Sequence, residues 1–303
     1  MSTLKPFLKW VGGKTQILDN VLELFPTEMN NYHEPFVGGG SVLLALLSHV
    51  KRKQITLHGT VYASDLNLNL IALYKNIQSH CEELIAQLKK LVDEFASCNN
   101  IEVNRNARTL GDALTSQETY YYWIRYRFNE LSHEERTTPL ASAMMLFLNK
   151  TCFRGVYREG PHGFNVPFGH YKNPTIFDEA HLHQVSTLIQ DVVFRCQSFV
   201  ESLMDLNDND FVYLDPPYAP ETTKSFVSYT ANGFNLDDHR TLFKMCNEIP
   251  TRFVMSNADV KLVRDSFLEE RYNIKIVSCR RAINSKKPES KTNEVLITNL
   301  RIL

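Results

Sequence analysis

The segment Asp215-Pro-Pro-Tyr218 combines residue types that can hold an amine, and it follows the apolar run Phe211-Val-Tyr-Leu214. Each proline fixes its own φ and biases the preceding residue toward extended backbone, so Asp215 and Pro216 should be rigid. The Asp215 carboxylate and the Pro216 carbonyl then offer two acceptors to one point, and Tyr218 can stack on a ring. A planar amine with two hydrogens, such as the amino group of adenine, fits this arrangement. The plainer interpretation is a buried strand that ends in a proline-rich turn.

A glycine-rich loop, Glu34-Pro-Phe-Val-Gly-Gly-Gly-Ser41, precedes an expected helix and would let a ligand approach the backbone. Gly38 and Gly40 match the first two glycines of the dinucleotide fingerprint G-x-G-x-x-G, but Leu43 occupies the third position, so the fingerprint is incomplete. The amino end of a helix still favours a carboxylate or another anion. Asp65, at the end of the next expected strand, is placed to accept hydrogen bonds from ribose hydroxyls. Loop and acid together indicate a nucleoside-type cofactor without a pyrophosphate.

A third candidate group, Trp10-Val-Gly-Gly-Lys14, joins an aromatic ring, a flexible backbone and a cation. The run Gly12-Gly-Lys-Thr15 looks like the end of a phosphate-binding loop, but that loop requires a glycine where this chain has Leu8, and no strand is expected before it. We therefore exclude a nucleoside-triphosphatase loop. The group suits a ligand that carries both a carboxylate and a ring.

Three regions of different pattern must position these motifs. Residues 1–78 alternate short helices and strands, which favours a parallel α/β sheet. Residues 79–149 are mostly helical by spacing, and we assign the aromatic run 120–123 to core packing because adjacent residues point around a helix. From about residue 178 the α/β pattern resumes, so we expect one α/β domain interrupted by a helical insertion. The later strands are expected at 211–215, 252–256, 272–284 and 292–300, the last two as an antiparallel hairpin.

The composition is that of an ordinary folded protein: 43% of its 303 residues are hydrophobic, and 33 Lys and Arg nearly balance 34 Asp and Glu. A net charge of −1 gives no argument for nucleic-acid binding, which only local charge could support. Two basic clusters exist, and each taken alone is best interpreted as a solvated loop surface. Their members are Lys150, Arg154, Arg158 and Lys172, and Arg280, Arg281, Lys286, Lys287 and Lys291.

The six cysteines are dispersed without a C-x-x-C pair, so we expect neither a metal site nor a disulfide framework, and a reducing compartment fits best. The apolar runs are shorter than the roughly 20 residues that cross a bilayer. The amino terminus has no features of a secretory signal. These patterns indicate a cytoplasmic protein with no membrane partner.

Taken together, the motifs resemble those of the DNA adenine methyltransferases that modify the exocyclic amine, the family that methylates adenine in GATC and similar short palindromes. Each motif alone is a weak match, whereas their joint occurrence in the family's order is highly specific. The matching segments are Phe7–Lys14, Glu34–Ser41, Ser64–Asn67, Phe164–Tyr171, Cys196–Phe199, Asp215–Tyr218 and Ser256–Asn257.

The resemblance implies an α/β fold of the Rossmann-like, S-adenosylmethionine-dependent type, with a mainly helical insertion domain and a β-hairpin. Residues 1–78 and 178–303 would form the catalytic, cofactor-binding domain, and 79–177 the target-recognition domain. The resemblance also implies S-adenosylmethionine as the cofactor, no metal, and Asp215, Pro216 and Tyr218 as catalytic residues. The cofactor-binding residues that it implies are Trp10, Lys14, Phe36, Gly38, Gly40, Asp65, Phe199 and Asp215.

Within the insertion, Lys150–Arg158 and the following turn Gly160–Gly163 resemble the family's DNA-reading β-hairpin. Arg158 matches an arginine that reads guanine, which the major groove supports through bidentate hydrogen bonds. GATC-specific relatives commonly carry Asn-Gly-Leu where this chain has Arg154-Gly-Val156, so CATG is an alternative site and Arg154 would read another base or a phosphate. The DNA-binding residues implied are Lys150, Arg154, Val156, Arg158, Asn165, Pro167 and Tyr171.

The resemblance predicts a site-specific enzyme that methylates the N6 amine of a flipped adenine in duplex DNA. It would be the modification half of a restriction–modification system, with a cognate restriction endonuclease as partner, or an orphan or viral methylase. A methyltransferase acting on RNA or a protein amide, which uses a similar proline-rich acceptor, and a non-catalytic DNA-binding regulator are the alternatives. A regulator would be expected to have lost pocket residues that this chain keeps. A cytosine-ring methyltransferase is excluded because no cysteine follows a proline.

Overall fold

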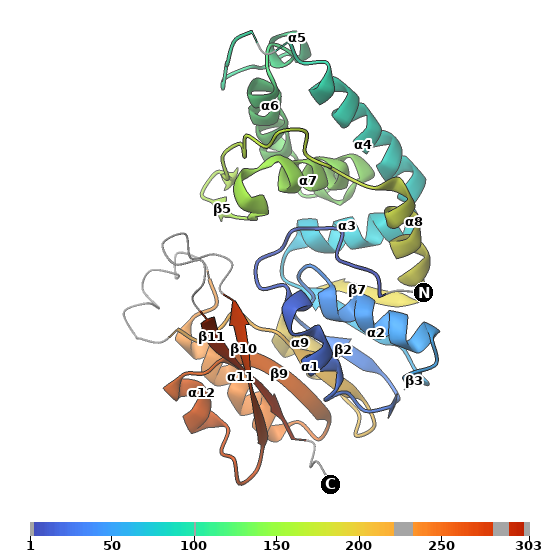
Figure 1. Cartoon of the computed structure of the whole chain (residues 1–303), viewed down its shortest axis with the longest axis vertical. Coiled ribbons are helices and arrows are strands. Elements are labelled where there is room, and N and C mark those ends of the chain that lie inside the picture. The colour runs from blue at the N-terminus through green and yellow to red at the C-terminus, as the bar shows by residue number, and fades with distance from the viewer. Residues whose placement is uncertain (1–2, 100, 221–232, 281–290, 300–303) are drawn as a thin grey trace.

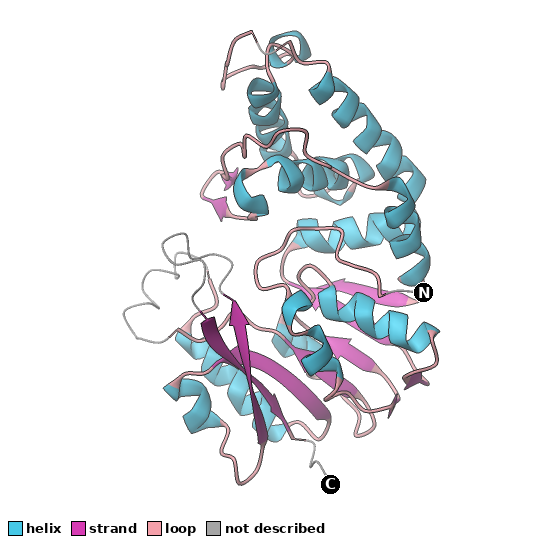
Figure 2. Ribbon diagram, viewed as in Figure 1, coloured by secondary structure: helices cyan, strands magenta, loops and turns pink. Residues whose placement is uncertain are grey.

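The computed structural model describes residues 3–99, 101–220, 233–280 and 291–299. Its centre is a seven-stranded sheet with the order β10-β11-β9-β8-β2-β4-β7 (Figure 2). The five parallel strands are β2 (Tyr32–Glu34), β4 (Val61–Asp65), β7 (Val192–Cys196), β8 (Phe211–Leu214) and β9 (Arg252–Ala258). The antiparallel strands β10 (Asn273–Arg280) and β11 (Lys291–Thr298) complete one edge. The predicted fold class is therefore confirmed.

The sheet is covered by apolar residues on both faces, as expected for parallel strands. Successive side chains of β8 alternate between two cores: Phe211 and Tyr213 join one, Val212 and Leu214 the other. Helices lie on both sides of the sheet (Figure 1). They are α1 (Leu18–Leu22), α2 (Ser41–Lys51), α3 (Leu68–Ser79), α8 (Glu179–Leu188), α9 (Phe199–Ser202), α11 (Leu236–Glu248) and α12 (Lys261–Ser266).

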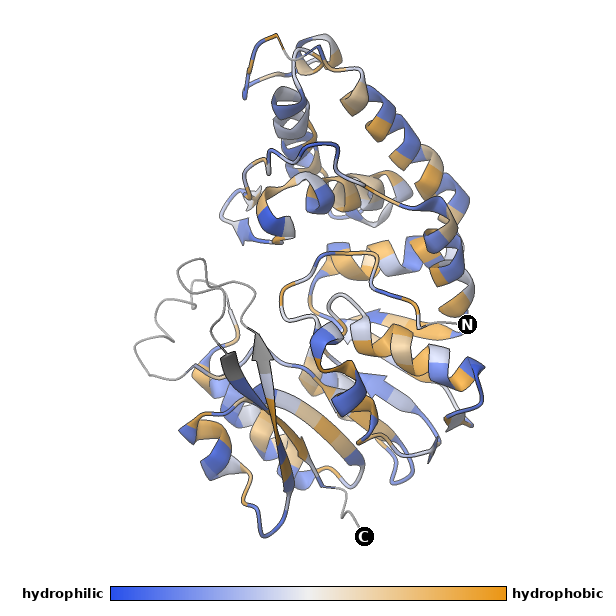
Figure 3. Ribbon diagram, viewed as in Figure 1, coloured by the Kyte–Doolittle hydropathy of each residue, from blue (hydrophilic) through white to orange (hydrophobic). Residues whose placement is uncertain are grey.

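A mainly helical unit stands over α3 and is formed by α4 (Cys81–Ala96), α5 (Leu110–Ala113), α6 (Gln117–Glu130) and α7 (Pro139–Thr151) (Figure 1). Hydrophobic and hydrophilic residues alternate along α4 (Figure 3), and its buried side chains include Leu84, Leu88 and Leu91 at helical spacing. The aromatic residues 120–123 are buried, which confirms their predicted core role. One apolar core runs without a break from this unit into the sheet.

The hairpin at the end of this unit is short, and its turn is the expected Gly160–Gly163. In it, β5 (Glu159–Gly160) and β6 (Gly163–Phe164) pair in antiparallel register, and an isolated antiparallel bridge joins Cys152 to Phe168. Lys150 still belongs to the last turn of α7, and Phe153–Gly155 form a 3-10 turn in which Arg154 has a φ of +59°. Helical and left-handed backbone therefore takes up most of the segment between Lys150 and Arg158. The segment expected to read DNA is a helix end and a turn that lead into a short hairpin.

The remaining elements are short: the 3-10 turns η1 (Lys14–Gln16) and η2 (Glu135–Thr137), and the parallel pair β1 (Glu28–Met29) and β3 (Thr56–Leu57). The predicted carboxyl-terminal hairpin is confirmed by the pairing of β10 with β11. Its connection, with Arg281, Lys286 and Lys287 of the second basic cluster, lies outside the described residues. Among the helices described, none is long and apolar enough to span a bilayer.

At the amino end of the central strands, the fully buried Asp210 gathers donors from two segments. Asn31 donates its backbone and side-chain N–H groups to Oδ1 at 3.1 and 2.9 Å, and Asn30 donates at 3.2 Å. Asn207 donates its backbone N–H to Oδ2 at 3.1 Å, and His33 Nε2 lies 3.2 Å from the same oxygen. This carboxylate therefore fastens the start of β2 to the turn before β8.

Replacing Asp210 by alanine should lower the free energy of unfolding by about 3 kcal/mol, because several buried donors would lose their acceptor. Urea denaturation followed by circular dichroism measures this, with the exposed neighbour Asp208→Ala as the matched control. Equal unfolding free energies for the two variants would contradict the role given to Asp210.

Candidate active site

The predicted motifs meet at the carboxyl edge of the parallel strands. The chain leaves β2 toward β4 on one side, whereas β8 pairs with β2 on the other, so the strand order reverses between β2 and β8. Open α/β sheets bind ligands at such a switch point. The glycine loop follows β2 and Asp215 follows β8, so both lie at this point.

Asp215 is held by a lysine from the amino-terminal segment. Lys14 Nζ lies 2.8 Å from Asp215 Oδ2, donates to the Gly12 carbonyl at 2.5 Å, and sits 4.9 Å from the centroid of the Tyr218 ring. The Lys14 side chain is only 4% exposed and that of Asp215 18%. Burial raises the pKa of Asp215 to about 6; Lys14 opposes this rise and Glu294 adds to it. The carboxylate is thus ionised at neutral pH and paired.

Tyr218 and the backbone after it are fixed by two strands of the sheet. The Tyr218 hydroxyl donates to Glu294 Oε2 of β11 at 2.7 Å. Burial, followed by the nearby Asp215 and Glu294 carboxylates, keeps the pKa of Tyr218 well above its usual value, so the hydroxyl remains a donor. Asn257 Oδ1, on β9, accepts from the Ala219 backbone at 3.0 Å. The proline-rich segment is therefore rigid in position as well as in backbone conformation.

The glycine loop is shaped by contacts with its neighbours. Gly40, the N-cap of α2, has a φ of +70°, and Tyr74 of α3 donates its hydroxyl to the Gly38 carbonyl at 2.9 Å. The Gly38 N–H donates to Asp65 Oδ2 at 3.2 Å, and the Asn67 N–H donates to Asp65 Oδ1 at 2.9 Å. Burial raises the pKa of Asp65 despite these donors. The loop and the acid expected to bind a nucleoside therefore touch each other.

A buried carboxyl group supports the loop from the sheet. Glu34 ends β2 and accepts a hydrogen bond from the Tyr32 hydroxyl at 2.7 Å and another from the Leu43 backbone. Burial raises the pKa of Glu34 to about 8, so the group is mostly neutral at pH 7. Glu34 joins the strand before the loop to the helix after it.

Three phenylalanines form an aromatic surface beside the loop. The rings of Phe36 and Phe199 stack with centroids 5.7 Å apart and an interplanar angle of 25°. Phe234, just before α11, lies 5.8 Å from Phe36 and 5.5 Å from Phe199. Such a cluster suits the flat ring of a nucleobase. Phe234 was missed by sequence reasoning.

Trp10 packs on the glycine loop from the other side. A Cβ atom at Gly39 would lie 2.9 Å from Trp10 Cβ, so the loop requires glycine there for close approach. The Trp10 ring also stacks on the ring of Tyr157, which belongs to the insertion, with centroids 5.3 Å apart. Trp10 therefore lies between the candidate cofactor loop and the candidate DNA-reading segment.

The predicted DNA-binding residues fall on the insertion near this contact. Arg158 Nε donates to Asn165 Oδ1 at 2.6 Å across the short hairpin. Asn165 and Pro167 are exposed and alternate with buried neighbours, while Arg154 is exposed on the 3-10 turn.

Two lysines lie near this segment. Lys9, which the sequence motifs did not indicate, has its Nζ 4.6 Å from the centroid of the Tyr171 ring. Lys150 is more enclosed: burial and then Lys9 lower its pKa. Val156 is half-buried in the same segment.

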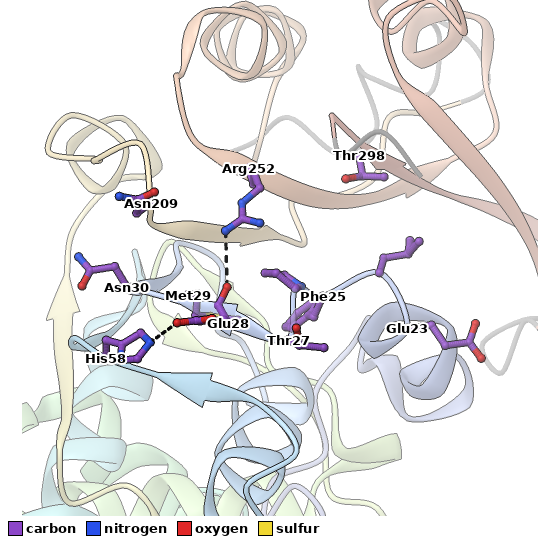
Figure 4. Close-up of a pocket in the computed structure, with 12 residues that line it drawn as sticks. Glu23, Phe25, Thr27, Glu28, Met29, Asn30, His58, Asn209, Arg252 and Thr298 are labelled. Atoms are coloured by element: carbon purple, nitrogen blue, oxygen red, sulfur yellow. Dashed lines mark hydrogen bonds and ion pairs between the residues drawn. The ribbon is translucent and has the colours of Figure 1, made fainter. Parts of the chain in front are cut away.

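A pocket of about 790 Å³ lies away from these motifs (Figure 4). It is lined by Met29 and Asn30 before β2, Asn209 before β8 and Arg252 at the start of β9, so it opens at the amino edge of the sheet. In it, His58 Nε2 lies 2.6 Å from Glu28 Oε1 (Figure 4). Within the described residues, no group of three or more His, Cys, Asp or Glu could hold a metal ion.

The model of the D12 class N6 adenine-specific DNA methyltransferase family matches residues 10–283. The chain belongs to this family. That assignment confirms the resemblance seen in the sequence, and it makes this protein a D12-class adenine-specific DNA methyltransferase.

Curated relatives match nearly the whole chain. The type II methyltransferase M.MjaIII of Methanocaldococcus jannaschii is 38% identical, over 98% of this chain and 99% of the relative. The DNA adenine methylase of Escherichia coli K12 is 31% identical over 94% and 91%. The type II methyltransferase M1.LlaDCHI of Lactococcus lactis subsp. cremoris is 29% identical over 98% and 95%.

Several residues of this D12-class methyltransferase that shape the site carried no usable signal in the sequence. Glu294 reaches Tyr218 from the last strand, Tyr74 reaches the loop from a buried helix, and Phe234 comes from a stretch without a motif. Each is joined to its partner by a contact between segments far apart in the chain. Lys9 and Tyr157 lie inside or next to recognised motifs, but only the fold shows which way they face.

Gly40→Ala should lower the free energy of unfolding by about 1–3 kcal/mol, because an L side chain is strained at this φ. The new Cβ would also lie 2.5 Å from the Tyr74 hydroxyl oxygen. Removing that hydroxyl relieves the clash, so the double variant with Tyr74→Phe should be more stable than the sum of the single effects. Thermal and urea unfolding measure all four proteins. Gly13→Ala, at a φ of −54°, is the matched control, and strictly additive effects would contradict the contact.

Proposed function

We propose that this methyltransferase transfers a methyl group from S-adenosylmethionine to the N6 amine of an adenine flipped out of a short palindromic site in duplex DNA. The observation that carries the proposal is the meeting of three motifs at one switch point. Asp215 and its prolines lie beside the glycine loop, and the loop bonds directly to Asp65.

The residues present fit S-adenosylmethionine. Asp65 is oriented by two backbone N–H groups and is placed to accept from ribose hydroxyls, and the Phe36, Phe199 and Phe234 cluster offers a surface for an adenine ring. Trp10, Lys14 and the loop glycines, Gly38 and Gly40, would hold the methionine portion, where a cation and helix amino end favour its carboxylate. When bound, this group supplies a sulfonium methyl as the electrophile.

The target adenine must leave the helix, because its amine is inaccessible to in-line transfer within the duplex. Tyr218 would stack on the flipped base, with its ring fixed by Glu294. Lys14 lies at Asp215 Oδ2, so Oδ1 is the oxygen placed to accept one amine hydrogen while the Pro216 carbonyl accepts the other. Asp215, Pro216 and Tyr218 are the proposed catalytic residues.

The chemical contribution of these groups is orientation and electrostatic stabilisation. The nitrogen lone pair of adenine is delocalised into the ring. Two acceptors placed on one side of the amine favour a pyramidal nitrogen, which frees the lone pair to attack the methyl carbon. The nitrogen would gain the sulfonium methyl and lose one proton, which would pass to the Asp215 carboxylate and from there to solvent. No covalent intermediate with the protein is needed.

Residues 1–78 and 178–303 would form the catalytic domain, and 79–177 the target-recognition domain. Arg158 would read guanine, with Asn165 holding its guanidinium, and Arg154 would read a base or phosphate. The candidate sites are GATC and CATG. A modification role with a cognate restriction endonuclease and an orphan or viral role both fit these residues.

Modification-sensitive single-molecule sequencing tests the proposal on unmethylated genomic DNA incubated with the protein and S-adenosylmethionine. We expect N6-methyladenine in one four-base palindrome. Asp215→Ala should give no methylation, because the amine loses its charged acceptor. If the wild type binds S-adenosylmethionine but methylates no DNA, the substrate is RNA or a protein amide instead. Near-normal methylation by Asp215→Ala would refute the mechanism.

The acid side of the rate–pH profile should report Asp215. Its carboxylate must be ionised to accept the amine, so kcat/KM should fall as pH drops through about 6. Glu294 raises the pKa of Asp215, so Glu294→Gln, which keeps an acceptor for Tyr218, should move this fall to lower pH. Methyl transfer from labelled cofactor at a series of pH values measures it. Exposed Glu248→Gln is the control, and an unmoved profile for Glu294→Gln would contradict the assignment.

A further inference from the structure

Tyr157 lies within the candidate DNA-reading segment, between Val156 and Arg158, and it contacts both the hairpin and the body of the protein. Its ring stacks on Trp10 with centroids 5.3 Å apart and an interplanar angle of 27°. Its hydroxyl donates to Glu159 Oε1 at 2.6 Å. Tyr157 is half-buried, whereas Arg158 beside it is exposed. The residue is therefore placed to connect the DNA-reading segment with the residues beneath it.

The same hydroxyl reaches the region of Asp65. Asn69, buried in the first turn of α3, donates its side-chain N–H to the Tyr157 hydroxyl at 2.9 Å. Asn67, the N-cap of that helix, donates its backbone N–H to Asp65. Two residues of the helix start therefore join Tyr157 to the acid proposed to bind the ribose.

A second set of hydrogen bonds, made by Asn149, connects the amino-terminal segment to the candidate DNA-reading segment. The Asn149 side chain is buried, with 1% of the residue exposed. Its Nδ2 donates to the Lys9 carbonyl at 2.8 Å and to the Gly155 carbonyl at 3.1 Å, and its Oδ1 accepts from the Lys9 N–H at 3.0 Å. These bonds hold the residue before Trp10 close to the 3-10 turn that carries Arg154. The position of Trp10 relative to Tyr157 is thus fixed by the hydrogen bonds of Asn149 as well as by those of the Tyr157 hydroxyl.

Trp10 completes the connection to the cofactor side. A Cβ at Gly38 would lie 3.0 Å from the Trp10 ring, so the indole lies directly against the glycine loop. A ligand that contacts the loop and Trp10 restricts the ring, and the stacked Tyr157 ring is restricted with it. The residues on either side of Tyr157 would then hold one position relative to the DNA.

We propose that Tyr157 is a positioning residue that couples cofactor binding to recognition of the DNA site through its stack on Trp10 and its bonds to Asn69 and Glu159. The inference rests on the proposed function, because it needs both ligands. Coupling of this kind is reciprocal: cofactor tightens site-specific DNA binding by the same factor as DNA tightens cofactor binding. A merely structural tyrosine would change stability and leave that factor unchanged.

The test uses S-adenosylhomocysteine and a duplex that carries the site found by sequencing. Calorimetry gives the dissociation constant of each ligand with and without the other, for the wild type, Tyr157→Phe and Tyr157→Ala. The wild-type coupling factor should be at least about fivefold, a typical lower value for allosteric coupling. Tyr157→Ala should bring it close to one, and Tyr157→Phe, which keeps the stack but loses the hydroxyl, should give an intermediate value.

Two control variants distinguish a loss of coupling from a general effect of removing a tyrosine hydroxyl or ring on the folded protein. Tyr272→Phe removes a hydroxyl that donates to Asn247 at 2.8 Å, far from both ligands. Tyr62→Ala removes a ring that stacks on His33 with centroids 4.9 Å apart. Both should keep the wild-type factor. If Tyr157→Ala does not fold, as judged by circular dichroism, Tyr157→Phe decides the question.

A wild-type factor near one, or a factor in the Tyr157 variants equal to that of the wild type, overturns the inference. Either result can occur in a protein that methylates DNA normally, so the proposed function survives it. Failure of the wild type to methylate DNA or bind S-adenosylhomocysteine would instead refute the proposed function, and the inference with it. Loss of discrimination between the site and duplexes with one changed base pair, in Tyr157→Ala alone, would support the inference further.

Discussion

The ion pair between Lys14 and Asp215 is the interaction on which the arrangement of the site depends. An ammonium group that is 4% exposed is stable only with a partner, and the carboxylate after β8 is that partner. The pair requires the amino-terminal segment to cross the carboxyl edge of the sheet. That path in turn sets Trp10 against the glycine loop and Lys9 against the insertion. One buried charge pair therefore fixes the position of several motifs that are far apart in the chain.

The Lys14–Asp215 ion pair allows Asp215 to be buried and still ionised. A carboxylate enclosed by the sheet, with Glu294 nearby, tends to take up a proton, and a protonated group would accept an amine poorly. Lys14 offsets part of this tendency, so the group stays ionised near neutral pH. Glu294 cannot be omitted either, because it holds the Tyr218 ring. The opposing effects of Lys14 and Glu294 leave Asp215 ionised but close to its titration range.

The sequence predicted the elements well wherever a local pattern decides the structure. Buried strands, glycine and proline positions, and helical spacing identified the sheet, the loop after β2 and the segment after β8. Contacts between distant segments left no such pattern. Nothing near Glu294, Tyr74 or Phe234 indicates the partner that each one meets. The short hairpin turns at the predicted Gly160–Gly163. The segment before it is not a regular strand, because α7 runs on to Thr151 and the left-handed Arg154 follows.

At Arg154, local preference and observed structure disagree, as they also do at Lys53 and His170. The Arg154 φ of +59° is followed by +65° at Gly155, two consecutive left-handed residues. Asparagine tolerates this conformation better than arginine does. Arginine at this position costs about 1–2 kcal/mol of backbone strain. Its exposed guanidinium lies 5.2 Å from the Phe153 ring, a contact that offsets about 0.5–1 kcal/mol of this cost. Strain retained at an exposed residue of a reading segment points to function. The turn thus combines a strained backbone with an exposed guanidinium, which is the combination expected of a residue proposed to read a base or a phosphate.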